Sequence, residues 1–273
     1  MKPFFNTAFL TLLISFSTFA QNDTIVKKRY TAHNKGKFTV SWGGNREKYS
    51  QSDIHFVGDD YNFVVQSAKA HDKPKGWHVD YIMPGSMTKP QTNFKLGYFF
   101  TDKYSVSIGV DHMKYVMEQN QTANVTGVIN GNPPFNGGYV NQPTVLTEDF
   151  LMFEDTDGLN YVYTEIARQD DISKWFGIKN TDKFQVNINE GVGFGLLYPK
   201  TNTTLLGKER YDEFHVSGYG TSVKAGINFT IFKYFTIEGV LKGGYINMPD
   251  IRTTASKSDS ASQEFFFGET IIA

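Results

Sequence analysis

Apolar and polar side chains alternate along much of this chain. In FHVSGYGTSVKAGINFTIF, residues 214–232, every second residue from Val223 to Ile231 is apolar, with Lys, Gly, Asn or Thr between. Successive side chains of a strand point to opposite faces, so this period predicts strands with one apolar and one polar face. The pattern predicts eight strands, at residues 36–44, 91–100, 104–113, 159–168, 184–197, 214–232, 235–245 and 263–273.

The connections between these strands fall into two kinds. Residues 101–103 and 232–234 predict tight turns and 169–183 a moderate connection, whereas long polar segments occupy 45–90, 114–158, 198–213 and 246–262. If the first strand pairs with 91–100, every long segment lies at one end of the sheet and every short one at the other. The Asn-, Gly- and Pro-rich stretch 120–143 predicts a mobile external loop, the usual place for recognition.

The N-terminus indicates export. MKPFFNTAFLTLLISFSTFAQ contains one Lys, a mostly apolar run and a small-x-small site that ends at Ala20, as secretory signal peptides do. A transmembrane anchor is the alternative, but the run is short and interrupted by Asn and Ser. No later apolar run reaches about 18 residues, so any membrane crossing must use strands. We expect a signal peptide at 1–20, a periplasmic segment at 21–35 and a strand domain at 36–273.

Composition narrows the function classes. The 27 basic residues balance 28 acidic ones, so bulk charge suggests no nucleic-acid partner. The absence of Cys excludes a disulfide framework, Cys-ligated metals and a thiol nucleophile. The sequence also lacks a nucleotide-binding loop, a dinucleotide fingerprint and a zinc-binding helix. We therefore expect no cofactor.

The polar faces of the predicted strands carry isolated charges, although the opposite faces are rich in Phe, Ile, Val and Tyr. These charged residues are Lys95, Asp111, Glu165, Lys224, Glu238 and Lys242. A soluble β-sandwich is the alternative explanation of the alternation. Export, the segregated connections and the charged inner faces instead favour a closed barrel, the sheet that satisfies every backbone group in lipid.

The alternating strands and unequal connections resemble the small eight-stranded bacterial outer-membrane proteins of the OmpA/OmpX class, over residues 36–273. The resemblance implies an all-β, closed antiparallel eight-stranded transmembrane β-barrel with short periplasmic turns and long external loops. It implies the bacterial outer membrane, Sec-dependent export, and three kinds of partner: outer-membrane lipid or lipopolysaccharide, the barrel-assembly machinery and external ligands of the loops. The chain departs from the class by ending in Ile271-Ile272-Ala273 rather than an aromatic residue.

The three Lys and three acidic residues expected inside such a barrel predict a salt-bridged plug, because isolated buried charges are unfavourable. This disfavours an open pore, although a narrow channel for small solutes remains an alternative. Glu190 shares the parity of Ile188 and Val192, which would place it in lipid. We expect a bulge at 189–191 to turn it inward.

His215 and Ser217 are the candidate catalytic pair, since residues two apart on a strand share a face. His-x-Ser resembles the arrangement in outer-membrane lipid A deacylases, and a base beside a serine is the activation such chemistry needs. That family continues with Asn, where this chain has Gly218. Strand alternation places both side chains outward at the membrane interface. The simpler interpretation is that this His and Ser have no catalytic role.

Acidic and His residues cluster in the long segments. Residues 52–65 predict a hairpin that turns at 58–60. Two further clusters are solvated turns in the simpler interpretation and divalent-ion sites in the other. Residues 70–81 bring together His71, Asp72, His78 and Asp80, and residues 153–158 contain Asp155 and Asp157. The function that the sequence favours is a non-enzymatic barrel with a structural or surface-interaction role, with lipid A deacylation or a narrow channel as alternatives.

Overall fold

A computed structural model describes residues 33–74 and 91–273. The expected signal peptide at 1–20 and most of the segment 21–35 lie outside these residues. Within the described ranges, no helix is long and apolar enough to cross a membrane.

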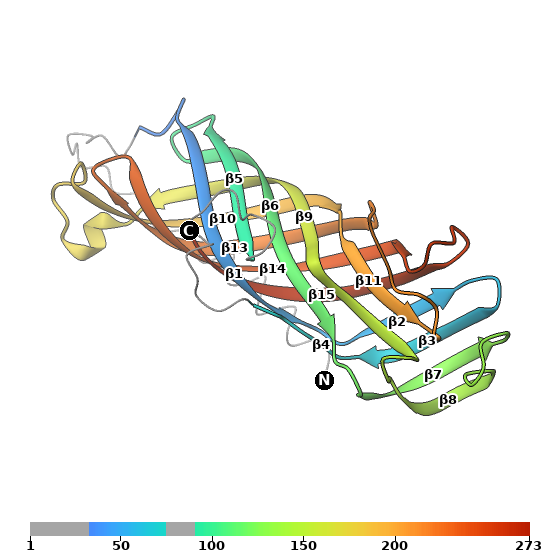
Figure 1. Ribbon diagram of the computed structural model, residues 1–273. Coiled ribbons are helices and arrows are strands. Elements are labelled where there is room, and N and C mark those ends of the chain that lie inside the picture. Colours follow the sequence, from blue (N-terminus) through green and yellow to red (C-terminus); the bar gives the residue numbers. More distant parts are fainter. Residues whose placement is uncertain (1–32, 75–90) are drawn as a thin grey trace.

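The fold is all-β and antiparallel, with one 3₁₀ helix, η4, among the elements described (Figure 1). The elements are β1 (Phe38–Tyr49), β2 (Ser52–Val57), β3 (Tyr61–Ala68), β4 (Ala70–His71), β5 (Thr92–Phe99), β6 (Tyr104–Met117), β7 (Thr122–Ile129), β8 (Gly137–Val145), β9 (Leu151–Asp171), η4 (Ser173–Phe176), β10 (Phe184–Leu197), β11 (Lys200–Leu205), β12 (Tyr211–Phe214), β13 (Gly218–Ile231), β14 (Phe235–Arg252) and β15 (Ser260–Ile272).

Eight strands follow one another in the order β1-β5-β6-β9-β10-β13-β14-β15, and β1 pairs with β15 as well as with β5. Each of the eight predicted strand ranges overlaps one of these strands, so their prediction as strands is confirmed. The tight connections 101–103 and 232–234 lie at one end, which we call the turn end. The sheet continues beyond β15 through β2, β3, β7 and β8, which we call the distal layer (Figure 1).

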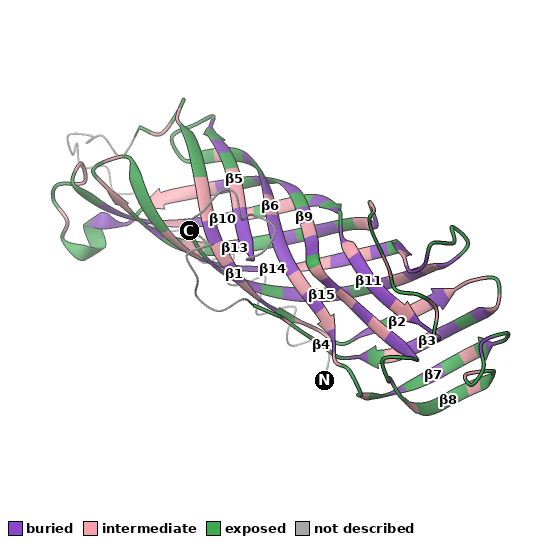
Figure 2. Cartoon of the chain, viewed as in Figure 1, coloured by how far each residue is buried: buried purple, intermediate pink, exposed green. Residues whose placement is uncertain are grey.

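The eight strands expose their apolar face and bury their charged one. Phe38 is 82% exposed, Val40 73% and Leu241 67%, whereas Glu165 is 2% exposed and Lys224 9%. Figure 2 shows the resulting alternation of buried and exposed residues along the strands. The arrangement is the reverse of a water-soluble fold, in which large contiguous exposed apolar surfaces are rare.

The distal layer corrects the expectation of long polar loops. Residues 122–129 and 137–145 form β7 and β8, and β7 pairs with both β3 and β8. The prediction of a mobile loop at 120–143 is therefore wrong, because alternating Ala123 and Val125 are buried within a sheet. The hairpin predicted at 52–65 is confirmed: β2 pairs with β3, and the N–H of Gly58 donates to the carbonyl of Tyr61 at 2.9 Å.

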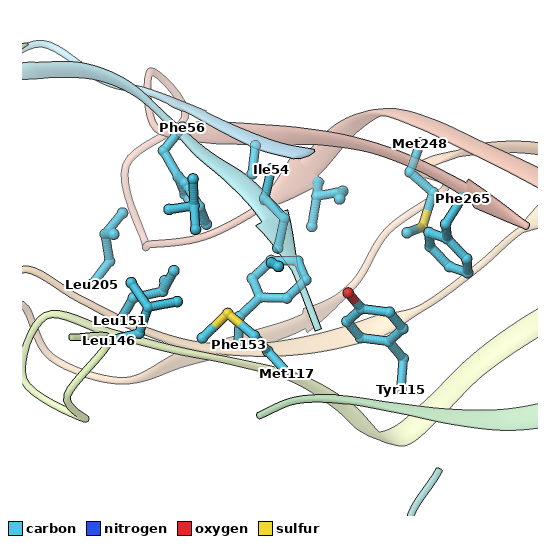
Figure 3. Packing of buried hydrophobic residues seen from close by; sticks show 14 of the residues in the cluster. Ile54, Phe56, Tyr115, Met117, Leu146, Leu151, Phe153, Leu205, Met248 and Phe265 are labelled. Carbon is cyan, nitrogen blue, oxygen red and sulfur yellow. The ribbon is translucent and has the colours of Figure 1, made fainter. Parts of the chain in front are cut away.

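A hydrophobic core holds the distal layer against the far ends of the eight strands. Phe56 of β2 and Phe63 of β3 stack with ring centroids 5.2 Å apart, and Phe56 meets Phe153 of β9 edge-on at 5.9 Å. Figure 3 shows Phe56 and Phe153 in this core, together with Tyr115 and Phe265. Since each fully buried Phe contributes about 1.5–3 kcal/mol, these rings supply the stability that polar loops would lack.

Candidate functional site

Four charged side chains from four strands meet on the buried inner face of the eight strands. Lys224 Nζ of β13 lies 2.7 Å from Glu165 Oε1 of β9. Lys95 Nζ of β5 lies 3.6 Å from Glu165 and 3.7 Å from Glu238 of β14. We call this group the turn-side cluster. Its two Lys and two Glu compensate one another, as buried charges must.

A second group, the distal-side cluster, lies further from the turn end. Lys242 pairs with Asp111, and its Nζ lies 3.7 Å from Glu269 Oε2. The amide of Asn93 donates to Asp111 at 2.6 Å and to Glu269 at 2.9 Å, and Asn45 donates to Glu269 at 2.8 Å. Five strands are tied together by these bonds, and the interior at this level is occupied by side chains.

All six charges singled out in the sequence lie in these two clusters, but two acids were missed. Glu269 lies two residues after Phe267 in the same strand, and both side chains are buried. Strand alternation is the signal that places Glu269 on the inner face. Glu47 lies in β1 beyond the predicted strand end at residue 44. Gln91 Nε2 donates to Glu47 and to Asp72, so this part of the interior is acidic and bonded through amides.

A cavity of about 910 Å³ occupies the interior between the turn-side cluster and the turn end. Tyr234, 88% exposed, and Thr236 lie on its lining, so the cavity opens at the turn end. Apolar residues such as Val40, Trp42 and Phe99 and charged residues such as Lys37, Arg168 and Lys233 also line the cavity. Part of its wall is formed by uncharged polar side chains: Ser41, Ser107, Gln169, Gln185, Asn189, Asn228 and Thr230. Side chains therefore do not fill the interior over its whole length, and the charges form its floor.

Carboxamides are concentrated on one side of this cavity. Asn187 Nδ2 donates to Asn228 Oδ1 at 2.7 Å, and Asn228 Nδ2 donates to Gln169 Oε1 at 3.1 Å. Asn189 is 6% exposed, yet neither atom of its amide has a hydrogen-bond partner in the protein. Gln185 Nε2 is likewise buried and unpartnered. Such groups are costly to bury and mark places where something else completes the bonding.

The structure does not assemble His215 and Ser217 into a catalytic pair. His215 Nε2 lies 2.8 Å from Asp250 Oδ2, an acid that sequence reasoning did not identify. Ser217 Oγ faces the carbonyl of His215 at 3.5 Å, not its imidazole, and Ser217 is 1% exposed. The predicted outward placement of Ser217 is wrong, because residues 215–217 lie between β12 and β13 and leave the strand alternation.

The structure does not bring Asp155 and Asp157 together as a pair of ion ligands. Asp155 is fully buried and accepts a hydrogen bond from Thr201 Oγ1 at 2.6 Å. Burial, with a smaller contribution from the charge of Glu154, raises the pKa of Asp155 to about 7, against the opposing Thr201 bond. Asp157 is half exposed and lies 3.4 Å from Lys200 Nζ. The two carboxylates therefore face different surroundings.

The other proposed ion cluster is only partly described. Asp72 Oδ1 accepts from Gln91 at 2.5 Å and Oδ2 accepts from the N–H of Glu47 at 3.1 Å, while His71 ends β4. His78 and Asp80 lie outside the described residues. In the described ranges, no three His, Asp or Glu side chains gather in a way suited to a metal ion.

Glu190 does not turn inward. The register of β10 with β9 and β13 is continuous through Glu190, which pairs with Arg168 and is exposed, so the predicted bulge is wrong. Arg168 is itself paired with Asp170, at 2.6 Å. The outward Glu190 of β10 therefore has a basic residue, Arg168, opposite it on the neighbouring strand β9.

No family model and no curated protein matches the chain. Among solved structures, Ail, the attachment invasion locus protein of Yersinia pestis, is 11% identical with a TM-score of 0.29, covering 88% of this chain and 99% of Ail. OprG, an outer membrane protein from Pseudomonas aeruginosa, is also 11% identical with a TM-score of 0.29, covering 90% and 99%. OmpT of Vibrio cholerae is 10% identical with a TM-score of 0.16, covering 92% and 100%. The similarity to these three proteins is low both in sequence identity and in TM-score.

Proposed function

We propose that this chain is a closed eight-stranded β-barrel of the bacterial outer membrane, with a non-enzymatic structural or surface-interaction role. In this proposal the signal peptide is removed after Ala20, and the turn end faces the periplasm. The distal layer lies outside the cell and offers its surface to external ligands, while lipid or lipopolysaccharide surrounds the exposed apolar face.

The observation that carries the proposal is the course of the strand pairing. Starting at Phe38, successive partners lead through the whole set and return to β1: Tyr98, Val106, Ile166, Val192, Val223, Gly243, Gly268 and Lys48. The path returns ten residues beyond its start, from Phe38 to Lys48. For eight strands, a stagger of this size corresponds to a tilt of about 40°, the range of transmembrane barrels.

The distribution of aromatic residues supports a membrane-spanning barrel. Outward positions near the turn end carry Tyr104 and Phe235, and those toward the distal layer carry Tyr219, 42% exposed. Phe194 stacks on Tyr219 with ring centroids 6.2 Å apart, and Tyr245 packs on Phe266 at 5.3 Å. Two aromatic zones flanking an apolar band are the pattern of a membrane-spanning barrel.

Single-cysteine variants test the proposal, since the native chain has no Cys to react. Val140→Cys in the distal layer should react with a membrane-impermeant maleimide on intact cells, whereas Lys233→Cys at the turn end should react only after lysis. Recovery in the outer-membrane fraction and a heat-dependent shift in gel mobility are expected alongside. A mature protein that is soluble and monomeric, or labelling of both sites before lysis, would refute the proposal.

A further inference from the structure

The cavity at the turn end has the size and lining of a ligand site. Its volume of about 910 Å³ lies in the range of small-molecule pockets, about 300–1,000 Å³. Its floor is formed by the turn-side cluster, and beyond Lys95 and Glu165 lies a void of about 20 Å³, room for a single water. A solute that enters from the turn end would therefore be retained against the floor.

The lining favours a ligand without net charge. Glu165 is paired with Lys224 and Lys95, so a charged ligand at the floor would compete with an existing ion pair. Near the mouth, Lys37 Nζ donates to Asn34 at 2.9 Å, and Lys233 lies 3.8 Å from Asp182. Arg168, also on the lining, is paired with Asp170 at 2.6 Å, so the cations of the site are already engaged with groups of the protein.

The carboxamides define what the ligand must offer. The unpartnered amide of Asn189 has two N–H donors and a carbonyl acceptor, and Gln185 Nε2 adds further donors. Asn228 on the lining accepts a hydrogen bond from Asn187 behind it and donates one to Gln169, so this part of the wall is fixed before a ligand arrives. Hydroxyl and amide groups, which both donate and accept, complement such a wall better than apolar or ionic groups do.

We propose that this cavity binds an uncharged ligand rich in hydroxyl and amide groups, of mono- to disaccharide size, which enters from the turn end. Phe99 of β5, 7% exposed, lies on the lining and supplies an apolar surface for the C–H face of a ring. The site is separate from the distal layer, so the proposal stands or fails independently of any surface interaction.

The test uses the mature chain refolded in detergent micelles, with N,N′-diacetylchitobiose as the neutral probe. Chitobiose and glucuronate serve as cationic and anionic comparators. We expect saturable binding of the neutral probe with a Kd below about 100 mM. The NMR resonances of the side-chain amides of Asn189 and Gln185 should shift on binding. The comparators should bind at least about tenfold more weakly.

The variant Asn189→Leu separates binding from folding. Because it removes an unpartnered buried amide, thermal stability should be kept or raised, while affinity for the neutral probe falls by about tenfold or more. The matched control is Asn247→Leu, at a position outside the cavity lining where the amide bonds Tyr245 and Glu264, and its affinity should equal that of the parent. Absence of saturable binding, a preference for a charged comparator, or equal affinity in Asn189→Leu would each overturn the proposal.

Discussion

Lys224 of β13 reaches across β10 to place its Nζ 2.7 Å from Glu165 of β9. Gly191 of β10 lies beneath this crossing, and a Cβ there would make tight contacts, 3.1 Å from Lys224 Cε and 3.0 Å from the carbonyl oxygen of Ile166. A strand interior normally disfavours Gly, and here its missing side chain makes the space for the long Lys side chain.

Replacing Lys224 should therefore destabilise the fold. Lys224→Met leaves Glu165 with only the longer contact to Lys95, and we expect the free energy of unfolding in lipid vesicles to fall by about 3 kcal/mol. The double variant Lys224→Met/Glu165→Gln should recover part of this loss. The matched control Lys103→Met breaks a 2.8 Å pair with Asp170 in which the Lys is half exposed, and should cost at most about 1 kcal/mol. Equal losses in the two single variants would contradict a buried role for the cluster.

The exposed apolar band gives a prediction that separates a membrane barrel from a soluble sheet. Val192, 59% exposed, lies in the middle of the band, so Val192→Arg should destabilise the refolded protein by about 2–4 kcal/mol in vesicles. In β8 of the distal layer, Val145 is 50% exposed, and Val145→Arg should leave stability within about 0.5 kcal/mol. A soluble sheet would tolerate both changes alike, which unfolding in urea would reveal.

The distal layer should unfold locally when its core is opened. Phe63→Ala removes a fully buried ring that packs on Phe56 and Phe150, a change that costs about 3–5 kcal/mol. Hydrogen exchange of the β3 and β7 amides should accelerate, while the heat-dependent gel shift of the eight strands persists. The control Val140→Ala alters a side chain that is 87% exposed and should leave exchange unchanged. Loss of the gel shift in Phe63→Ala would mean that the two parts fold as one unit.

Period-two alternation made the eight strands predictable, because one face of each strand is mainly apolar and the other mainly polar. The composition of the distal layer concealed it: the Gly, Asn and Pro residues of β7 and β8 suggested a loop, whereas the buried Ala123, Val125 and Ile129 distinguish β7 from one. Parity alone could place Lys224 and Glu165 inside. It could not show their contact, which depends on the register of three strands.

The cavity and the separation of His215 from Ser217 could not be predicted from the sequence, because both depend on where residues distant in sequence lie. The strand pattern predicts Asn189 as an ordinary inward polar residue. That its amide has no hydrogen-bond partner in the protein depends on the positions of all its neighbours. The parity rule failed at Ser217 because the strand is interrupted there. The acid that faces His215, Asp250, comes from β14, 35 residues away in sequence.

Asp155 should make stability depend on pH in a direction opposite to that of an ordinary paired carboxylate. Its folded-state pKa of about 7 lies above the unfolded value of about 3.9, so the folded protein retains a proton that the unfolded chain releases. The contribution of Asp155 to stability is complete below about pH 4, falls as the pH rises, and levels off above about pH 7. Between these two pH limits, the contribution of Asp155 to the free energy of unfolding changes by about 4 kcal/mol.

The variant Asp155→Asn isolates this effect. An uncharged amide keeps an acceptor for Thr201 and cannot ionise, so the variant should gain stability relative to the parent as the pH rises from 4 to 8. Comparing the variant with the parent at each pH cancels the titration of other groups, and hydrogen exchange of the β11 amides, which pair with β9 beside Asp155, provides the measurement. Asp157→Asn, at a half-exposed carboxylate two residues away, should show no such gain. If the difference between Asp155→Asn and the parent is the same at pH 4 and pH 8, the buried carboxyl does not titrate between them, and the pH dependence belongs to other groups.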